Sequence, residues 1–388
     1  MKNIFKYLLL LLIPFSCKEK YISPVVSPAT GYLVVEGVIN SGPGETNITL
    51  SRTTPLNKQT VLFETGATVL VEGEDNSRFL LKEVSSGKYS TANMALSNTK
   101  KYRLSIATKD GKKYQSDFSS VNYNPPIDSV NWKRQGRDVQ LYVNTHDPNN
   151  NTKYYQWEYV ETWELHTYYL STLKYKEVTN SRGVTTYSAV YNDSSSFGPD
   201  LTKYFCWRTE PSTTIFTGTS SNLSSDVINL PMISIPADSW KLNILYSVNT
   251  KQYSLSKGRY EFLQRMKKNT ESTGSVFDAQ PSELNSNIHC VSNPLEPVIG
   301  YIDICPIQEK RIYINRKSLP DWNYSQSCSE IEVPNNSDSI AIKALFLLPT
   351  YPKTDPMTGR IISFFAAPPE CVDCKLRGSS IKPSFWPN

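Results

Sequence analysis

The clearest chemical signal in this sequence is a cysteine close to its start. Two lysines precede an unbroken apolar stretch at residues 7–13, and Pro14-Phe15-Ser16 leads directly into Cys17. This order is that of a secretory signal peptide, and the stretch is shorter than the roughly 20 apolar residues that span a bilayer. Bacterial lipoproteins are acylated and cleaved at such a cysteine. We therefore predict a signal peptide at residues 1–16 and lipidation of Cys17, against the alternative of an ordinary signal peptide.

Six further cysteines lie in the second half of the chain. An even number in an exported protein favours disulfide bonds, although sequence cannot choose the pairing. The CxxC spacing of Cys371 and Cys374 would indicate a redox or zinc site in a cytosolic protein, but no second CxxC and no nearby histidine accompany it. We expect structural disulfides and leave an unpaired remainder open. The six are Cys206, Cys290, Cys305, Cys328, Cys371 and Cys374.

Other catalytic patterns are weak. The three histidines, at positions 146, 166 and 289, share no ligand spacing, and the sequence contains no HExxH, GxSxG or phosphate-binding glycine motif. The paired carboxylates of a glycoside hydrolase need no local motif, so that class stays an alternative. We expect a protein that is not an enzyme and that uses no cofactor or metal.

One segment resembles a calcium loop by spacing. Asp147, Asn149 and Asn151 occupy its first, third and fifth positions, and Glu158 the twelfth. Thr152, however, replaces the glycine that the loop requires at its sixth position, and the flanking segments look like strands. We therefore predict a simple β-turn.

The elements around these residues are mainly strands. Residues 17–31 are rich in serine, threonine, proline and glycine, which indicates a tether. Residues 32–124 contain about seven short segments in which apolar and polar residues alternate, a pattern that predicts an Ig-like or transthyretin-like β-sandwich. Pro125-Pro126 marks a boundary, because prolines cannot donate ladder hydrogen bonds.

Residues 125–388 predict a second, larger β-rich domain. One helix is expected in it, capped by Ser254 or Ser256, with Phe262 and Met266 near one face, and ending at residues 269–274. Residues after 319 are expected to be irregular and stapled by cysteines.

An aromatic run at residues 154–169 permits two interpretations. Exposed aromatic rings could stack on sugars or anchor a partner protein, whereas the alternative is packing across strands. We expect packing for at least half of the run and name Trp163, Tyr168 and Tyr169 as candidates for ligand or partner contact.

The charge pattern excludes one class of partner. The formal charge of +5 falls to +3 without the two signal-peptide lysines, and the basic residues are spread along the chain. A nucleic-acid-binding protein would concentrate them in a patch.

Several blocks of the sequence, in order, resemble the DUF4249 lipoproteins of Bacteroidota. The resemblance extends over nearly the whole mature chain and names no catalytic residues. It implies an outer-membrane lipoprotein, often encoded beside TonB-dependent receptors. The blocks include residues 33–39, 49–53, 66–69, 125–129, 251–256, 274–278, 297–301 and 371–386.

From these features we expect a lipid-anchored outer-membrane protein. Lys18-Glu19-Lys20 resembles the signal for export to the cell surface. Our first hypothesis is a non-catalytic accessory or binding partner of a TonB-dependent β-barrel transporter. The alternative is a glycan- or peptide-binding surface lipoprotein that uses exposed aromatic residues.

Overall fold

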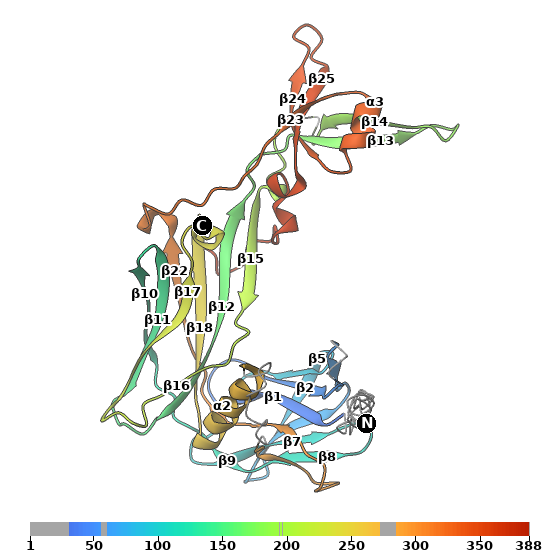
Figure 1. Cartoon of the computed structure of the whole chain (residues 1–388). Helices are drawn as coiled ribbons and strands as arrows, with labels where there is room; N and C mark the ends of the chain where they lie inside the picture. Colours follow the sequence, from blue (N-terminus) through green and yellow to red (C-terminus); the bar gives the residue numbers. More distant parts are fainter. Residues whose placement is uncertain (1–30, 56–59, 194, 196, 272–284, 388) are drawn as a thin grey trace, which may run out of the picture.

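The computed structural model describes residues 31–55, 60–193, 195, 197–271 and 285–387. Within this part the chain is mostly β and forms three lobes arranged end to end (Figure 1). The N-terminal lobe contains residues 32–121 and 285–305, the middle lobe residues 127–166, 205–254 and 308–322, and the tip lobe residues 173–191 and 331–367. The predicted signal peptide and Cys17 lie outside the described residues. No helix in the described ranges is long and apolar enough to cross a membrane.

The N-terminal lobe is built on one sheet that curls around a single core. Its strands follow the order β19-β8-β7-β4-β5-β6-β2-β1-β20, and β5 pairs with β4 on one side and with β6 on the other. Alternation places Leu33, Val35, Val69 and Val71 in the core. The strands are β1 (Leu33–Asn40), β2 (Thr46–Arg52), β3 (Leu62–Phe63), β4 (Thr68–Gly73), β5 (Arg78–Ser85), β6 (Lys88–Thr91), β7 (Lys101–Ala107), β8 (Lys113–Ser116) and β9 (Ser119–Ser120).

A distant segment completes this lobe. β19 (Ile288–Cys290) pairs with β8, and β20 (Ile299–Gly300) and β21 (Ile304–Cys305) run parallel to β1. The sequence predicted that residues 125–388 form one continuous domain, but residues 288–305 return to the N-terminal sheet. Ile288, Ile302 and Ile304 are buried in its core, so this burial holds the returning chain in place.

The middle lobe is a sandwich of two sheets. One sheet has the order β10-β11-β17 and the other β15-β12-β18-β22, with β16 also paired to β12. Trp157, Trp163 and Leu141 are fully buried between them. The strands are β10 (Ile127–Gln135), β11 (Asp138–Asp147), β12 (Tyr154–His166), β15 (Phe205–Pro211), β16 (Phe216–Thr219), β17 (Asp226–Ile235), β18 (Leu245–Ser254) and β22 (Gln308–Asn315), with short 3-10 turns η1 (Leu201–Lys203), η2 (Trp240–Leu242) and η3 (Arg316–Ser318).

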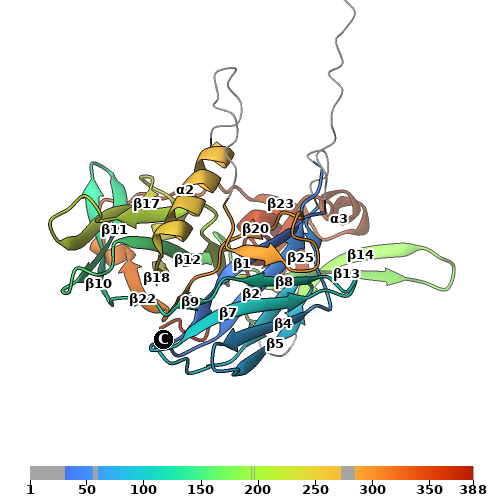
Figure 2. The ribbon, with the colours of Figure 1, turned by 90° about the horizontal axis from the view of Figure 1, so that it is seen from below.

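Helix α2 (Lys257–Glu271) lies between the N-terminal and middle lobes (Figure 2). The predicted helix is confirmed, and Ser256 rather than Ser254 caps it, since its hydroxyl accepts a hydrogen bond from the Arg259 amide over 3.2 Å. Phe262 and Leu263 pack with Val38 of β1 and Tyr253 of β18. The helix therefore joins the two lobes through its apolar face.

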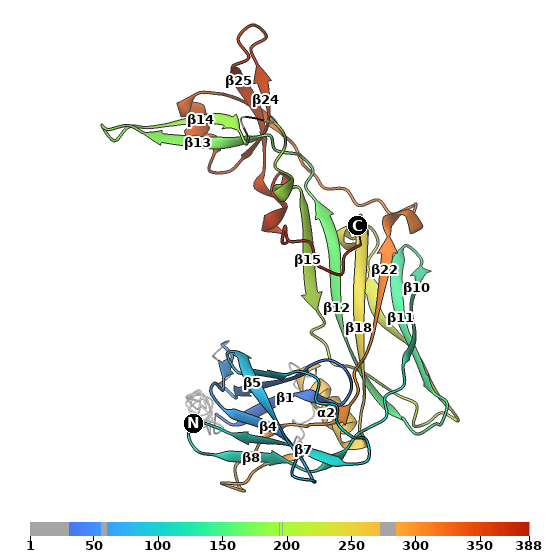
Figure 3. The same ribbon diagram turned by 180° about the vertical axis from the view of Figure 1, so that it is seen from behind.

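The tip lobe corrects the prediction that the end of the chain is irregular. It contains the hairpin β13 (Leu173–Thr179) and β14 (Thr185–Tyr191), a sheet of order β23-β25-β24 and a further helix, α3. Asn336 caps this helix by accepting from the Ser339 amide over 2.9 Å. The bounds are β23 (Ile331–Pro334), α3 (Ser337–Lys343), β24 (Leu348–Thr354) and β25 (Ile361–Ala367). The lobe lies at the far end of the molecule from the N-terminal lobe (Figure 3).

Disulfides attach the end of the chain to the body of the protein. Cys206 of β15 bonds to Cys374, and Cys328 bonds to Cys371. The two cysteines of the CxxC segment therefore belong to different bonds, on the 3-10 turns η4 (Pro369–Cys371) and η5 (Cys374–Leu376). The predicted disulfides of this region are confirmed. Cys290 and Cys305 are buried and free, and each packs among apolar side chains.

Candidate functional site

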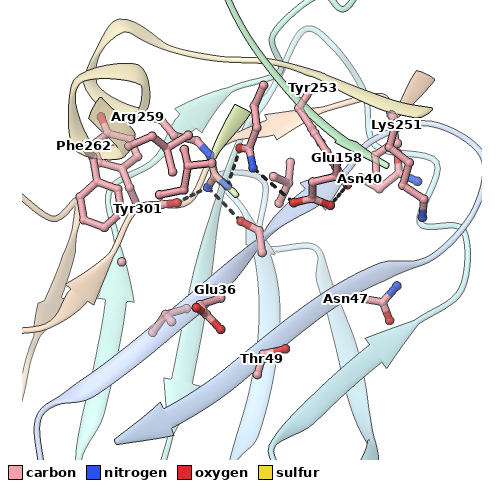
Figure 4. Close-up of a pocket in the computed structure, with 18 of the residues that line it drawn as sticks. Glu36, Asn40, Asn47, Thr49, Glu158, Lys251, Tyr253, Arg259, Phe262 and Tyr301 are labelled. Atoms are coloured by element: carbon pink, nitrogen blue, oxygen red, sulfur yellow. Dashed lines mark hydrogen bonds between the residues drawn. The ribbon is translucent and has the colours of Figure 1, made fainter. Parts of the chain in front are cut away.

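The candidate site is a cleft of about 650 Å³ where the N-terminal lobe, the middle lobe and α2 meet (Figure 4). Ligand sites in proteins have volumes of this order and are common at domain junctions. The cleft is lined from β1 and β2 on one side, from β12 and β18 on the other, and from α2, and its wall mixes apolar and charged side chains.

Strand alternation selects which side chains face the cleft. Leu33 and Val35 of β1 point into the N-terminal core, so Val34 and Glu36 point outward to the cleft. On β12, Trp157 points into the middle core, so Gln156 and Glu158 line the opposite wall. The cleft is thus formed by the outer faces of two separately packed sheets.

Arg259 holds the closed end of the cleft together. Only 7% of this residue is exposed. Its Nη1 donates to the carbonyl of Gly37 over 2.9 Å and to the carbonyl of Tyr301, and its Nη2 lies 3.4 Å from Gln156 Oε1. Its Nε has no hydrogen-bond partner within the described chain. One guanidinium therefore contacts both lobes.

The Asp303 carboxylate binds Ser256, the residue that caps the start of α2. Its carboxylate accepts hydrogen bonds from the Ser256 amide over 2.7 Å and from the Ser256 hydroxyl over 2.8 Å. Burial raises the pKa of Asp303 above its ordinary value, while the charge of Arg259 and the bonds from Ser256 oppose this rise. The hydrogen bonds between Asp303 and Ser256 therefore fix the first turn of the helix that carries Arg259.

Carboxylates outnumber the cations of the cleft. Glu36, Glu45, Glu158 and Glu309 line it, against Lys251 and Arg259. Arg259 is engaged by backbone carbonyls, and Lys251 lies 3.3 Å from Glu309. Both cations are thus already engaged inside the protein.

The exposed carboxylate of Glu158 accepts a hydrogen bond from the Tyr253 hydroxyl over 2.9 Å. Burial raises the pKa of Tyr253, so this phenol remains a donor. Glu36 is exposed, and no side-chain hydrogen bond or ion pair joins it to another described residue. With Phe262, Leu263 and Met266 as an apolar wall, the arrangement suits a ligand that carries both a cationic group and an apolar group.

The aromatic residues selected from the sequence lie elsewhere. Trp163 is fully buried, which corrects its choice as an exposed contact, because β12 is a central strand and this side chain packs against Trp240 at a ring distance of 5.3 Å. Tyr168 is 58% exposed, and Tyr169 is half-buried against it, with ring centroids 4.8 Å apart. Both follow the end of β12 that lies away from the cleft.

The calcium-like segment is a turn, as predicted. The Asp147 carboxylate accepts from the amides of Asn149, Asn151 and Thr152 at 2.9–3.0 Å. Its oxygens are therefore occupied by N–H donors that close the turn before β12.

The cleft residues were missed at the sequence level. Glu36 stands within an apolar run and Arg259 within a basic helix, and neither residue has a local motif. The one available signal was a charged residue on the outward face of an otherwise apolar strand.

One known protein family matches most of this chain. The family described as a domain of unknown function, DUF4249, matches residues 19–311. The chain belongs to the DUF4249 family. No curated protein matches the sequence. Every residue that lines the cleft lies within the DUF4249 match, whereas α3 and the sheet of the tip lobe lie beyond it, so the match is shorter than the resemblance predicted from the sequence.

Proposed function

We propose that this protein is a lipid-anchored outer-membrane protein of Bacteroidota, held at the cell surface, that acts as a non-catalytic partner of a TonB-dependent transporter. Its N-terminal lobe would be an Ig-like or transthyretin-like module that carries the anchor. The signal-peptide pattern before Cys17 and the family resemblance support the location. An exposed apolar surface on the tip lobe supports the proposal that the protein has a protein partner.

This surface, the tip patch, consists of Ile342, Leu345 and Phe346. These side chains are 65%, 75% and 70% exposed. They follow the spacing of one helical face, and hydrogen bonds from the Phe346 and Leu347 amides to the Lys343 carbonyl continue the turn of α3. Contiguous exposed apolar groups of this kind mark protein contacts. The partner that we assign to the patch is the part of such a transporter that projects out of the membrane, since the tip lobe lies at the far end of the molecule from the N-terminal lobe.

Affinity purification from detergent-solubilised membranes tests this assignment. The full lipoprotein, tagged at its C-terminus, should recover a β-barrel transporter, and Ile342→Ser/Leu345→Ser/Phe346→Ser should reduce recovery about tenfold. Met357→Ser is the matched control, because Met357 is 95% exposed in the same lobe but lies outside the patch. Recovery of no barrel by the unmodified protein would remove the proposal. Palmitate labelling, lost in Cys17→Ala, separately tests the anchor.

The cleft favours a second function, capture of a short basic peptide. The observation that carries it is the excess of carboxylates beside an apolar wall, with both cations engaged. Of the aromatic candidates of the alternative hypothesis, Trp163 is buried, and Tyr168 and Tyr169 follow the end of β12 that lies away from the cleft.

Peptide titrations by calorimetry test the cleft. A lysine- and phenylalanine-containing pentapeptide should bind, and Glu36→Gln or Glu158→Gln should weaken binding about three- to tenfold. Glu177→Gln, on the exposed hairpin of the tip lobe, is the control and should change nothing. Equal binding of an acidic peptide would contradict the electrostatic basis of the proposal.

A further inference from the structure

A group of exposed apolar side chains surrounds the point where the described chain begins. Val61 is 64% exposed, Leu62 57%, Phe63 38%, Val84 65% and Leu295 93%. We call these five residues the tether-exit patch. They come from three separate segments of the N-terminal lobe, so their common location arises from the fold.

Register and hydrogen bonds place the patch beside the tether. The Gly31 amide donates to the Thr53 carbonyl over 3.0 Å, and one residue earlier Arg52 pairs with Leu62 across β2 and β3. The start of the described chain and the exposed β3 strand therefore meet at the same end of β2.

The other two segments are held at the same place. Phe63 packs beside the turn after β5, since a Cβ on Gly87 would lie 2.8 Å from Phe63 Cβ, and Val84 precedes this turn. On the other side, Glu296 forms ion pairs with Lys112 over 2.6 Å and with Arg52 over 3.8 Å, and Arg52 donates to the Gly31 carbonyl over 3.1 Å. These contacts position Leu295 next to the exit.

Charged residues of both signs flank the patch, and Glu64, Glu83 and Glu296 adjoin its three segments. Lys82, Lys88 and Lys109 are exposed near it. The nearby carboxylate of Glu83 is engaged by the amides of Gly66 at 2.7 Å and Gly87 at 3.0 Å. Apolar side chains beside lysines suit the interface of a bilayer, where the side chains enter the acyl boundary and the ammonium groups meet lipid phosphates.

We propose that the tether-exit patch rests on the lipid surface and fixes the orientation of the protein on the membrane. This inference depends on the anchor at Cys17 in the proposed function. The 13 residues between Cys17 and Gly31 make 14 Cα–Cα steps, which reach at most about 50 Å, so the exit cannot lie farther than this from the lipid anchor. β5 lies on the side of the N-terminal lobe turned away from the middle lobe, which leaves this side free for contact (Figures 1 and 3).

Depth-dependent fluorescence quenching tests the contact. The mature chain, with Cys17→Ser and an N-terminal histidine tag in place of the acyl group, is bound to nickel-chelating vesicles of phosphatidylcholine and phosphatidylglycerol. An environment-sensitive dye is attached at Leu62→Cys, Val84→Cys or Leu295→Cys, with Leu345→Cys in the tip patch as the control. The native free cysteines, Cys290 and Cys305, are buried, so the introduced thiol is the accessible one among the described cysteines.

The dye at the three tether-exit positions should be quenched at least about twofold by spin-labelled acyl chains, and the dye at position 345 should not. Solvent-like emission at all four positions would overturn the inference. So would quenching that requires native membranes containing the transporter, because the patch would then be a protein interface. Since the tag replaces the acyl group, the result does not depend on lipidation. Failure of the proposed anchor would appear instead as absence of palmitate at Cys17.

Discussion

Arg259 of α2 donates a hydrogen bond from Nη1 to the carbonyl oxygen of Gly37 on β1, over 2.9 Å. Gly37 has a φ of 140°, and a Cβ at this position would lie 2.5 Å from the carbonyl oxygen of Asn47. This backbone conformation therefore requires glycine. The same guanidinium reaches Tyr301 and Gln156, so one side chain connects the first strand, the returning segment and the middle lobe.

Replacing Arg259 should loosen the junction of the lobes. Arg259→Ala leaves buried carbonyls without a donor, and we expect the free energy of unfolding to fall by about 2–4 kcal/mol. Urea unfolding measures this change, and small-angle scattering should report a broader range of lobe orientations. Arg182→Ala, at the exposed hairpin turn, is the control. Equal stability of the two variants would show that the junction is held by apolar packing alone.

Lys241 should stabilise the fold because its ammonium group lies between two carboxylates that face each other. Glu161 of β12 lies opposite Glu210 of β15, and Lys241 Nζ lies 3.0 Å from the first and 3.8 Å from the second. Like charges opposite one another destabilise a sheet. Lys241→Met should therefore lower the free energy of unfolding by about 1–3 kcal/mol. The further change Glu210→Gln should restore part of this free energy. Additive effects in this double-mutant cycle would refute the bridge. Lys353→Met, at an exposed ion pair with Glu332, should cost less than about 1 kcal/mol.

Mass spectrometry of the oxidised protein should find the bonds 206–374 and 328–371, with Cys290 and Cys305 free. The first bond closes a separation of 168 residues, so Cys206→Ser/Cys374→Ser should lower stability by about 3–5 kcal/mol through the entropy of the unfolded chain. Thermal unfolding of the variant measures this loss. A bond between Cys371 and Cys374 would contradict the structure.

Acid should lower the stability of the N-terminal lobe because it protonates the carboxylate of Glu296. Burial raises the pKa of this carboxyl, but hydrogen bonds from Lys112 and Tyr114 and the charges of Lys112 and Arg52 outweigh burial and leave the pKa below its ordinary value of 4.5. A depressed carboxyl pKa stabilises the folded state above the unfolded pKa, and this contribution disappears as the pH falls through the lower folded pKa.

Chemical unfolding at several values from about pH 7 to about pH 3 measures this dependence. Glu296→Gln should lower the free energy of unfolding by about 2 kcal/mol at neutral pH. As the pH falls, the free energy of unfolding of this variant should decrease less than that of the unmodified protein. Parallel curves for the two proteins would rule out Glu296 as a source of the acid sensitivity.

Local pattern was sufficient for many elements. Alternation within residues 32–124 predicted strands such as β1, and serine capping with an apolar face predicted α2. These signals depend on neighbours within a few residues, which sequence displays directly. α3 was missed because it is short, although Asn336 offered a cap.

Partners distant in sequence were decided by the fold alone. Alternation shows that Ile304 faces a core but not that its strand lies beside β1, more than 260 residues earlier, because many strands satisfy the same pattern. In the same way, Trp163 carried an aromatic signal that fits a surface or a core, and only the central position of β12 buried it.

The sequence by itself determined the β-rich class and the cysteines available for bonding, and it predicts a lipid anchor at Cys17. Tertiary structure decided which cysteines pair, and it brought Glu36, Glu158 and Arg259 to one cleft. The physical reason is that strand pairing and lobe contact are selected by burial and hydrogen bonding summed over the whole chain, which no short window of residues contains.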